Sequence, residues 1–332
     1  MKLTNLLTGA AVMTVMLATT GTSSEAKTLR LATQAPEGSV WANQIQKLAD
    51  EVAAADVDLD IEIFWNGQLG GLSETFKQTI MGRTDIWAGT TPFMSSVSPE
   101  VGILGVPFMF NDDEQAKCVF PQLEAPMREV IGKKYHLLHL APVGTQDINA
   151  KKPIRTPDDV AGLRVRTAPV EGAIIYYRAA GAVPQPMSPA EAPAALQTGL
   201  LDAIDNDATF TILTGMHKLV PYHTPLSSVH VVAGYVVSPR SWAGLSDEQQ
   251  AALQKAADSL DFASDFDDVE AFDAQLLERA QGEGTTVVEI TPEEREQWHA
   301  LGKQVQPEVI ASIRGNTKQV VEAIDAAKAV CK

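Results

Sequence analysis

Two short segments carry the residues of this sequence best suited to ligand chemistry. Arg164 and Arg166 alternate with apolar residues in Gly162–Val170, a pattern typical of a short β-strand. A second apolar segment, forty residues further on (206 minus 166), ends in Asp205, Asn206 and Asp207. A guanidinium presents a planar fork of donors that matches a carboxylate. We expect the two segments to form two walls of one binding site.

Motifs for catalysis, nucleotide binding or metal binding find little support. The sequence has no GxSxG, GxxxxGKS/T, GxGxxG or HExxH motif. His136 and His139 lie three residues apart on a predicted strand and therefore on opposite faces, which does not suit a shared metal ion. We expect no catalytic residue, no cofactor and no metal site.

The acidic composition limits the classes of partner. The chain has 332 residues, with 26 Lys and Arg against 42 Asp and Glu, and a formal net charge of −16. Nucleic acids and anionic membranes are therefore poor partners. The overall field also repels a small anionic ligand, so its capture depends on local cations such as Arg166.

The first 26 residues have the pattern of an export signal. Lys2 supplies a positive charge, Leu6–Thr19 an apolar core, and Ser24 to Ala26 a cleavage site with small residues. We expect cleavage after Ala26 and a periplasmic protein, with an uncleaved membrane anchor as the alternative.

The two cysteines, Cys118 and Cys331, have two interpretations. Export permits a disulfide, which would tie the end of the chain to a helix in the first half. Two buried free thiols are the alternative, and the sequence contains no geometry that decides between them.

Strand and helix patterns alternate along the mature chain, whose roughly 300 residues suggest two domains. A strand pattern at Thr28–Thr33 precedes a helix pattern at Val40–Ala53, and the second half continues with a helix at Glu171–Ala180 and an apolar strand at Val229–Ser238. The stretch from Ser246 to Gly284 predicts one uninterrupted helix. At about 1.5 Å per residue it spans on the order of 50 Å, enough to cross both domains.

Several stretches, in this order, resemble the DctP-type substrate-binding proteins of TRAP (tripartite ATP-independent periplasmic) transporters. The stretches are GQLGG, ETFKQTIMGRTDIWAG, GVPFMF, GLRVR, MSPAEAPAALQTGLLDAIDND and SPRSWAGLSDEQQAALQKAA. The resemblance covers nearly the whole mature chain. It implies an α/β, two-lobe periplasmic-binding-protein-like fold, with a ligand cleft between the lobes and a long helix spanning both. We assign residues 27–143 plus about 232–271 to lobe I, and 144–231 plus about 272–332 to lobe II.

The resemblance also assigns roles to the site residues. It implies that Arg166 holds the ligand carboxylate, that Asn206 hydrogen-bonds the same group, and that Arg164 lies at the surface. Asp205 can accept from a ligand hydroxyl or amine, although a helix cap or turn is the alternative for Asp205, Asn206 and Asp207. Gln146 stands where sialic-acid-binding members carry a second arginine, which disfavours sialic acid, as does Pro189 in place of an aromatic residue.

Members that bind their ligand through a metal ion tend to have an acidic residue followed by tryptophan at the position of Asp205 and Asn206. The asparagine disfavours a metal bridge here.

Additional residues could line the pocket, but packing in the core or an exposed position at the surface explains each of them equally well. They are Glu74, Trp87, Phe93 and Phe210, together with Gln34, Trp41 and Gln68.

The function that follows is a periplasmic receptor. We expect a monomer that binds a small organic acid, closes around it and delivers it to TRAP permease subunits. An exported hydrolase is an alternative, as is the binding protein of an ATP-driven importer. Turnover of a bound carboxylate would favour the hydrolase, whereas the order of the motifs favours a TRAP receptor over the importer.

Overall fold

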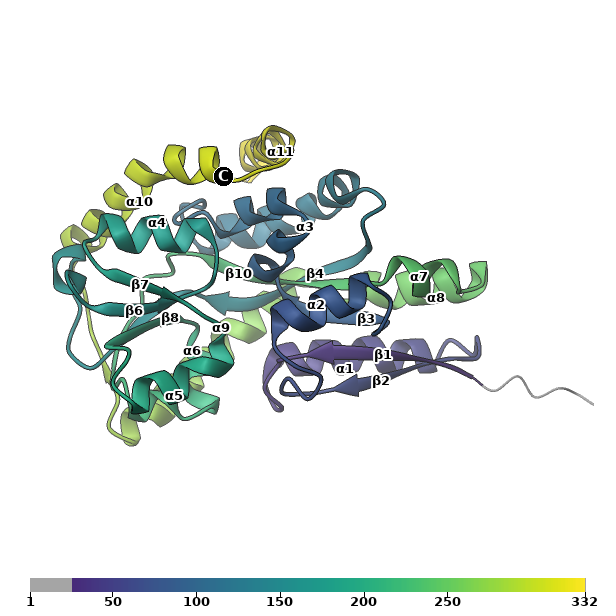
Figure 1. Ribbon diagram of the computed structural model, residues 1–332, viewed down its shortest axis with the longest axis horizontal. Coiled ribbons are helices and arrows are strands. Elements are labelled where there is room, and N and C mark those ends of the chain that lie inside the picture. The colour runs from purple at the N-terminus through teal and green to yellow at the C-terminus, as the bar shows by residue number, and fades with distance from the viewer. Residues whose placement is uncertain (1–25, 332) are drawn as a thin grey trace, which may run out of the picture.

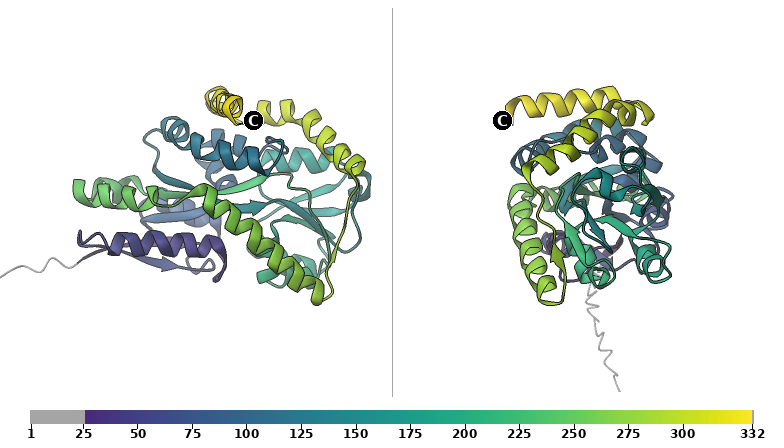
Figure 2. Two further views of the ribbon diagram at one scale, coloured as in Figure 1. Left: turned by 180° about the vertical axis from the view of Figure 1, so that it is seen from behind. Right: turned by 90° about the vertical axis from the view of Figure 1, so that its left-hand side faces the viewer.

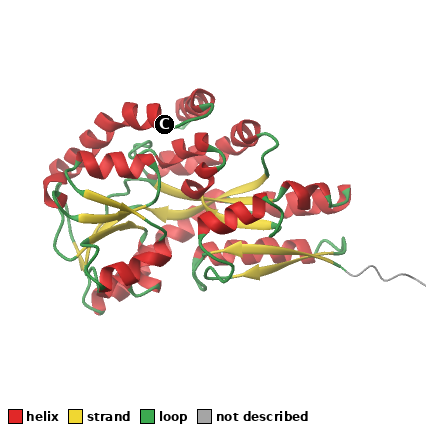
Figure 3. Ribbon diagram, in the orientation of Figure 1, coloured by secondary structure: helices red, strands yellow, loops and turns green. Residues whose placement is uncertain are grey.

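The computed structural model describes residues 26–331, and the predicted signal peptide lies outside this range except for Ala26. Two β-sheets lie side by side along the long axis of the molecule, with helices packed around them (Figures 1 and 3). Within residues 26–331, none of the helices combines the length and hydrophobicity that a membrane crossing requires.

The first sheet has five strands in the order β2-β1-β3-β10-β4. Strand β1 pairs in parallel with β2 and β3, whereas β10 is antiparallel to β3 and β4. Every residue of β10 is buried, which agrees with the apolar strand predicted at Val229–Ser238. The strands are β1 (Lys27–Thr33), β2 (Leu59–Phe64), β3 (Ile86–Thr90), β4 (His136–Thr145) and β10 (His230–Val237).

The second sheet has six strands in the order β11-β9-β5-β8-β6-β7. The two predicted walls are neighbours in it, because β6 and β8 pair in parallel with Arg166 opposite Ile204. The strands are β5 (Asp147–Ala150), β6 (Arg164–Thr167), β7 (Val183–Pro186), β8 (Ala203–Asn206), β9 (Tyr222–Thr224) and β11 (Thr286–Val287).

Several helices begin at a side-chain cap that the sequence supplies. Ser39 accepts from the N–H of Ala42 at the start of α1, and Asp112 accepts from the N–H of Gln115 at the start of α3. The helices besides α9 are α1 (Val40–Ala53), α2 (Leu72–Ile80), α3 (Asp113–Ile131), α4 (Glu171–Ala179), α5 (Ala192–Gln197), α6 (Ala208–Leu213), α7 (Pro239–Ala243), α8 (Asp247–Asp258), α10 (Pro292–Ser312) and α11 (Thr317–Val330).

The prediction of one uninterrupted helix from Ser246 to Gly284 is wrong. The chain breaks at residues 259–261 between α8 and α9 (Phe262–Gly282). Leu260 turns into the core of the first sheet, and the carboxylate of Asp261 accepts from the N–H groups of Ala263 and Ser264 as a new N-cap. Helix α9 alone still spans both lobes, because it packs on α1 and α3 of the first and on α6 and β11 of the second (Figure 2).

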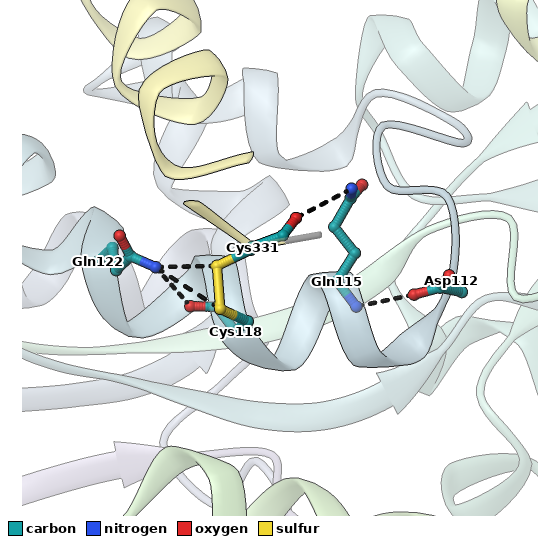
Figure 4. The surroundings of a disulfide bond; sticks show 5 residues. All are labelled: Asp112, Gln115, Cys118, Gln122 and Cys331. Atoms are coloured by element: carbon teal, nitrogen blue, oxygen red, sulfur yellow. Dashed lines mark hydrogen bonds between the residues drawn. A yellow bond between two sulfur atoms is a disulfide. The ribbon is translucent and has the colours of Figure 1, made fainter. Parts of the chain in front are cut away.

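The end of the chain returns to the first lobe. Helix α10 packs on α4, but α11 packs on α3 (Figure 1). Val320 and Ile324 of α11 are buried in the same apolar cluster as Phe120 of α3, so the packing of α11 is with lobe I. The two cysteines form a disulfide between α3 and the residue after α11, with Cα atoms 5.7 Å apart (Figure 4).

Candidate ligand-binding site

A pocket lies between the two sheets, with an empty volume of about 690 Å³ that includes its part open to solvent. The first sheet and its helices contribute Gln34, Trp41 and Phe93 to its lining. The second contributes Arg166, Asn206 and Phe210. Gln146 joins them from the crossing between β4 and β5. The pocket therefore unites residues from segments far apart in the sequence.

Arg166 is fixed in the wall of the pocket by backbone carbonyls. Only 2% of its surface is exposed. Its Nε and Nη2 donate to the carbonyl oxygen of Met187 at 3.1 and 2.9 Å, and Nη1 donates to that of Asp205 at 2.8 Å. Each Nη carries two N–H groups, so the second N–H of Nη2 has no partner among residues 26–331. The guanidinium is thus oriented and still has donor capacity.

Burial affects the charge of Arg166. Desolvation lowers the pKa of Arg166 to about 10, while the negative charges of Asp205 and Asp207 oppose the shift. The guanidinium therefore stays protonated at neutral pH. The carbonyls that hold it supply no negative charge, so an anion in the pocket would meet a buried cation with little competition from water.

Three amide side chains around the pocket have buried polar atoms without a hydrogen-bond partner within the described range 26–331. These atoms are Asn206 Nδ2, Gln146 Oε1 and Gln34 Oε1. Asn206 Oδ1 lies 3.5 Å from Arg166 Nη1, which places the amide beside the guanidinium. Unpaired buried amide groups are costly, and a polar ligand would satisfy them.

Aromatic rings supply much of the remaining wall. Trp41 and Phe93 are 5% and 4% exposed, and Phe210 faces them from α6. Phe93 belongs to a 3-10 turn, Thr91–Ser96, that directly follows β3. The pocket therefore combines one fixed cation, the carboxyl of Asp207 and several neutral polar groups inside a largely apolar enclosure.

Three of the predicted site residues do not line this pocket. Trp87 is fully buried and donates from Nε1 to Thr75 Oγ1 at 3.2 Å, packed against Phe76. Glu74 is exposed on α2 and accepts from Gln78. Asp205 faces a second, adjoining pocket.

The other residues named from the sequence are also placed. Gln34 and Trp41 line the pocket, as does Pro189, whereas Gln68 is exposed and does not. Arg164 is half-exposed and forms an ion pair with Asp202, in which its Nε and Nη2 donate at 2.8 and 2.7 Å.

Asp207 lines the pocket although the sequence did not single it out as a ligand contact. Its Oδ1 accepts from the N–H of Phe210 at 2.7 Å and caps α6. Burial raises the pKa of Asp207 to about 6. The sequence indicated Asp207 only as a possible helix cap, and capping alone does not show that a side chain also faces a cavity.

Across residues 26–331, no three or more His, Cys, Asp or Glu side chains stand together in an arrangement that could hold a metal ion.

Comparison with known proteins places the chain among solute-binding proteins. Residues 31–312 match the family model of DctP, bacterial extracellular solute-binding protein, family 7. The ectoine-binding periplasmic protein TeaA of Halomonas elongata is 25% identical over 317 residues, which cover 93% of this chain and 92% of TeaA. The C4-dicarboxylate-binding periplasmic protein DctP of Rhodobacter capsulatus is 28% identical over 313 residues, which cover 89% of each chain.

Solved structures share the fold. The sugar acid binding protein DctPAm from Advenella mimigardefordensis, in complex with galactonate, superposes with a TM-score of 0.84 at 22% identity. The superposition covers 92% of this chain and 99% of that one. The predicted two-lobe α/β fold is confirmed.

Proposed function

The chain belongs to the bacterial extracellular solute-binding proteins, family 7, and from that premise we propose that it captures a small organic acid and delivers it to TRAP permease subunits. The relatives TeaA and DctP are named as periplasmic binding proteins, and the solved structure of the ectoine-binding protein is named as part of the TeaABC TRAP transporter. We also propose that the chain is periplasmic, that its signal peptide is cleaved after Ala26, and that it acts as a monomer.

The observation that carries the proposal is that Arg166 is buried, charged and only partly hydrogen-bonded. A buried cation with one N–H that has no partner in the described chain, beside an Asn206 Nδ2 that also lacks one there, is suited to a carboxylate. Charge-assisted hydrogen bonds contribute about 1.5–3 kcal/mol each. Micromolar affinity requires about 8 kcal/mol, so the aromatic walls and the neutral amides must supply the remainder.

The charges around the pocket favour a ligand with one carboxylate. Arg166 and Asp207 are the charged side chains that line it within residues 26–331. Gln146 is neutral, so a second carboxylate would find no cation there and would lie near Asp207. The relatives are named for ectoine and C4-dicarboxylates, and the superposed structure holds galactonate. Ligands therefore differ among these proteins, and for this chain we propose a single carboxylate bound by Arg166.

Closure of the two lobes supplies the signal to the permease. Ligand groups that contact both walls bind the closed arrangement better than the open one, and this difference shifts the population toward closure. Helix α9 packs on both lobes, so it is one of the elements that such a motion must involve.

A thermal-shift screen of the mature protein against mono- and dicarboxylates and sugar acids tests the proposal. We expect at least one monocarboxylate to raise Tm, and Arg166→Ala to abolish the shift. Arg164→Ala is the matched control, because Arg164 lies two residues away and pairs with Asp202 outside the pocket. A full shift in Arg166→Ala would reject the anchor, and turnover of the bound acid would reject a receptor.

A further inference from the structure

A second chamber adjoins the ligand pocket. The two cavities share Pro92, Gln146, Ala168 and Val231 in their linings. The second has an empty volume of about 370 Å³, including its part open to solvent, and most of its remaining lining is apolar. A ligand held at Arg166 therefore has a neighbouring space into which part of it can extend.

Two hydrogen-bond acceptors of this chamber are buried without a partner within residues 26–331. They are Asp205 Oδ1 and Gln146 Oε1. Asp205 is 4% exposed. The other polar side chains of the lining are Thr91 and His230, and the ring of His230 is already used, because its Nε2 lies 2.7 Å from Asp113 Oδ1. Two unpaired acceptors facing one small space leave a requirement for a hydrogen-bond donor.

The strand places Asp205 in this chamber. Asp205 and Asn206 are consecutive residues of β8, so their side chains point to opposite faces of the sheet. Asn206 lines the pocket that holds Arg166, and Asp205 lines the second chamber. One strand end therefore serves both cavities.

The wall between the cavities is held in place by the backbone of Gln146. Its N–H donates to the carbonyl of Val229 at 2.8 Å, and its carbonyl accepts from the N–H of Ser228 at 3.0 Å. Both bonds tie the crossing after β4 to the segment before β10. The amide of Gln146 is thus presented from a fixed backbone to both cavities.

We infer that the second chamber is a subsite for a hydroxyl or amino group of the ligand, bound by Asp205 and Gln146 while Arg166 holds the carboxylate. The inference rests on the proposed function and narrows the ligand to a hydroxy or amino monocarboxylate. Tyr177 also faces the Asp205 carboxyl, but a carboxyl has two oxygens with about four acceptor positions, so one neighbour does not exhaust it.

The test compares four-carbon acids that differ only in the donor. Butyrate and its 2-, 3- and 4-hydroxy and amino derivatives are titrated into the mature protein by calorimetry. Burial raises the pKa of Asp205 to about 7, so the titrations are made at pH 8.5, where its carboxyl is largely ionised. We expect one derivative to bind about tenfold more tightly than butyrate, the difference expected for one hydrogen bond with a charged partner. Asp205→Leu should reduce this preference to about threefold or less while leaving butyrate binding largely intact, because Asp205 does not line the pocket that holds Arg166. Gln146→Leu should reduce the same preference; because Gln146 lines both cavities, its effect is judged from the ratio of the affinities for the derivative and for butyrate.

Two further variants separate the chemistries. Asp205→Asn should keep most of a hydroxyl preference, because its amide oxygen still accepts, but should lose an amino preference that depends on charge. Tyr177→Phe is the control: if Asp205 only supported Tyr177, this variant would reproduce the effect of Asp205→Leu. Should Asp205→Leu fail to fold, Gln146→Leu carries the comparison, since Gln146 is only partly buried.

The outcomes distinguish the subsite from the proposed function. Arg166-dependent binding of all the acids without any preference, or a preference that persists in Asp205→Leu and Gln146→Leu, overturns the subsite and leaves the receptor intact. Absence of any Arg166-dependent binding overturns both.

Discussion

The two walls of the ligand pocket differ in chemistry. The second lobe presents its charged and hydrogen-bonding groups, Arg166, Asn206 and Asp207, from the ends of adjacent strands. The first lobe presents mainly Trp41 and Phe93, with Gln34 as a neutral polar group. The difference suggests a division of roles: the second lobe fixes the ligand's orientation through charge, and the first lobe closes an apolar surface over it.

The largest effect on binding is expected from Arg166→Lys. Lysine keeps the charge but cannot reproduce the planar contacts with the carbonyls of Met187 and Asp205. We expect a loss of about a hundredfold in affinity for the best carboxylate, measured by calorimetry. If Arg166→Lys binds within about threefold of the wild type, the positive charge alone anchors the ligand and the planar guanidinium is not needed.

The next largest effect is expected from Phe93→Ala in the first lobe. Removing the ring takes away apolar contact and leaves the carboxylate contacts of Arg166 in place, so affinity should fall about tenfold. The preference for a carboxylate over its primary amide should not change. A variant that also lost this preference would show that the two walls do not divide their roles.

A smaller effect is expected from pH through Asp207. Because burial raises the pKa of Asp207 to about 6, its repulsion of a ligand carboxylate is present above that pH and is lost as the pH falls through it. Asp147 and Arg166 lie close enough to influence the same carboxyl. Affinity for an acid of ordinary pKa should rise about threefold from pH 7.5 to 5.5.

Asp207→Asn provides the check on that assignment. Asparagine is also a good N-cap, so α6 should be retained while the charge is removed. Calorimetry at both pH values should show tighter binding at pH 7.5 and a smaller rise toward pH 5.5; the rise that remains belongs to Asp205, whose pKa burial raises to about 7. An unchanged pH profile would assign the titration to another group.

The smallest effect on binding is expected from breaking the disulfide, which lies between α3 and the end of α11. Closing a loop with a sequence separation of 213 residues stabilises the fold by roughly 5 kcal/mol in the loop-entropy picture. Cys118→Ser with Cys331→Ser should therefore lower Tm by several degrees but leave ligand affinity unchanged. A large change in affinity would link the chain's end to the pocket.

Local patterns predicted the elements that form the site. The alternation around Arg166 marked β6, and the apolar segment before Asn206 marked β8, because a strand's side chains repeat every two residues. The resemblance to a known family then assigned the separate positions of Arg164 and Arg166, which alternation places on one face of a strand.

The features that local patterns did not predict depend on contacts between residues distant in sequence. The break between α8 and α9 depends on Leu260 entering the core of the first sheet, and helical periodicity alone does not reveal that packing. Trp87 lies within β3 and Phe93 in the turn that follows it, yet the ring of Trp87 is enclosed beside Phe76 and the ring of Phe93 faces the pocket. Asp205 and Asn206 were assigned to one site, and the pleat of β8 divides them between two cavities.

The central claim is that Arg166 binds the ligand's carboxylate. Its most direct test replaces each partner with a neutral group of similar shape, the acid with its amide and Arg166 with glutamine. The best acid from the screen and its primary amide are titrated into the wild type and into Arg166→Gln by calorimetry. The wild type should prefer the acid by about a hundredfold, and Arg166→Gln should bind acid and amide within about threefold of each other. Retention of the full preference for the acid in Arg166→Gln would contradict the claim.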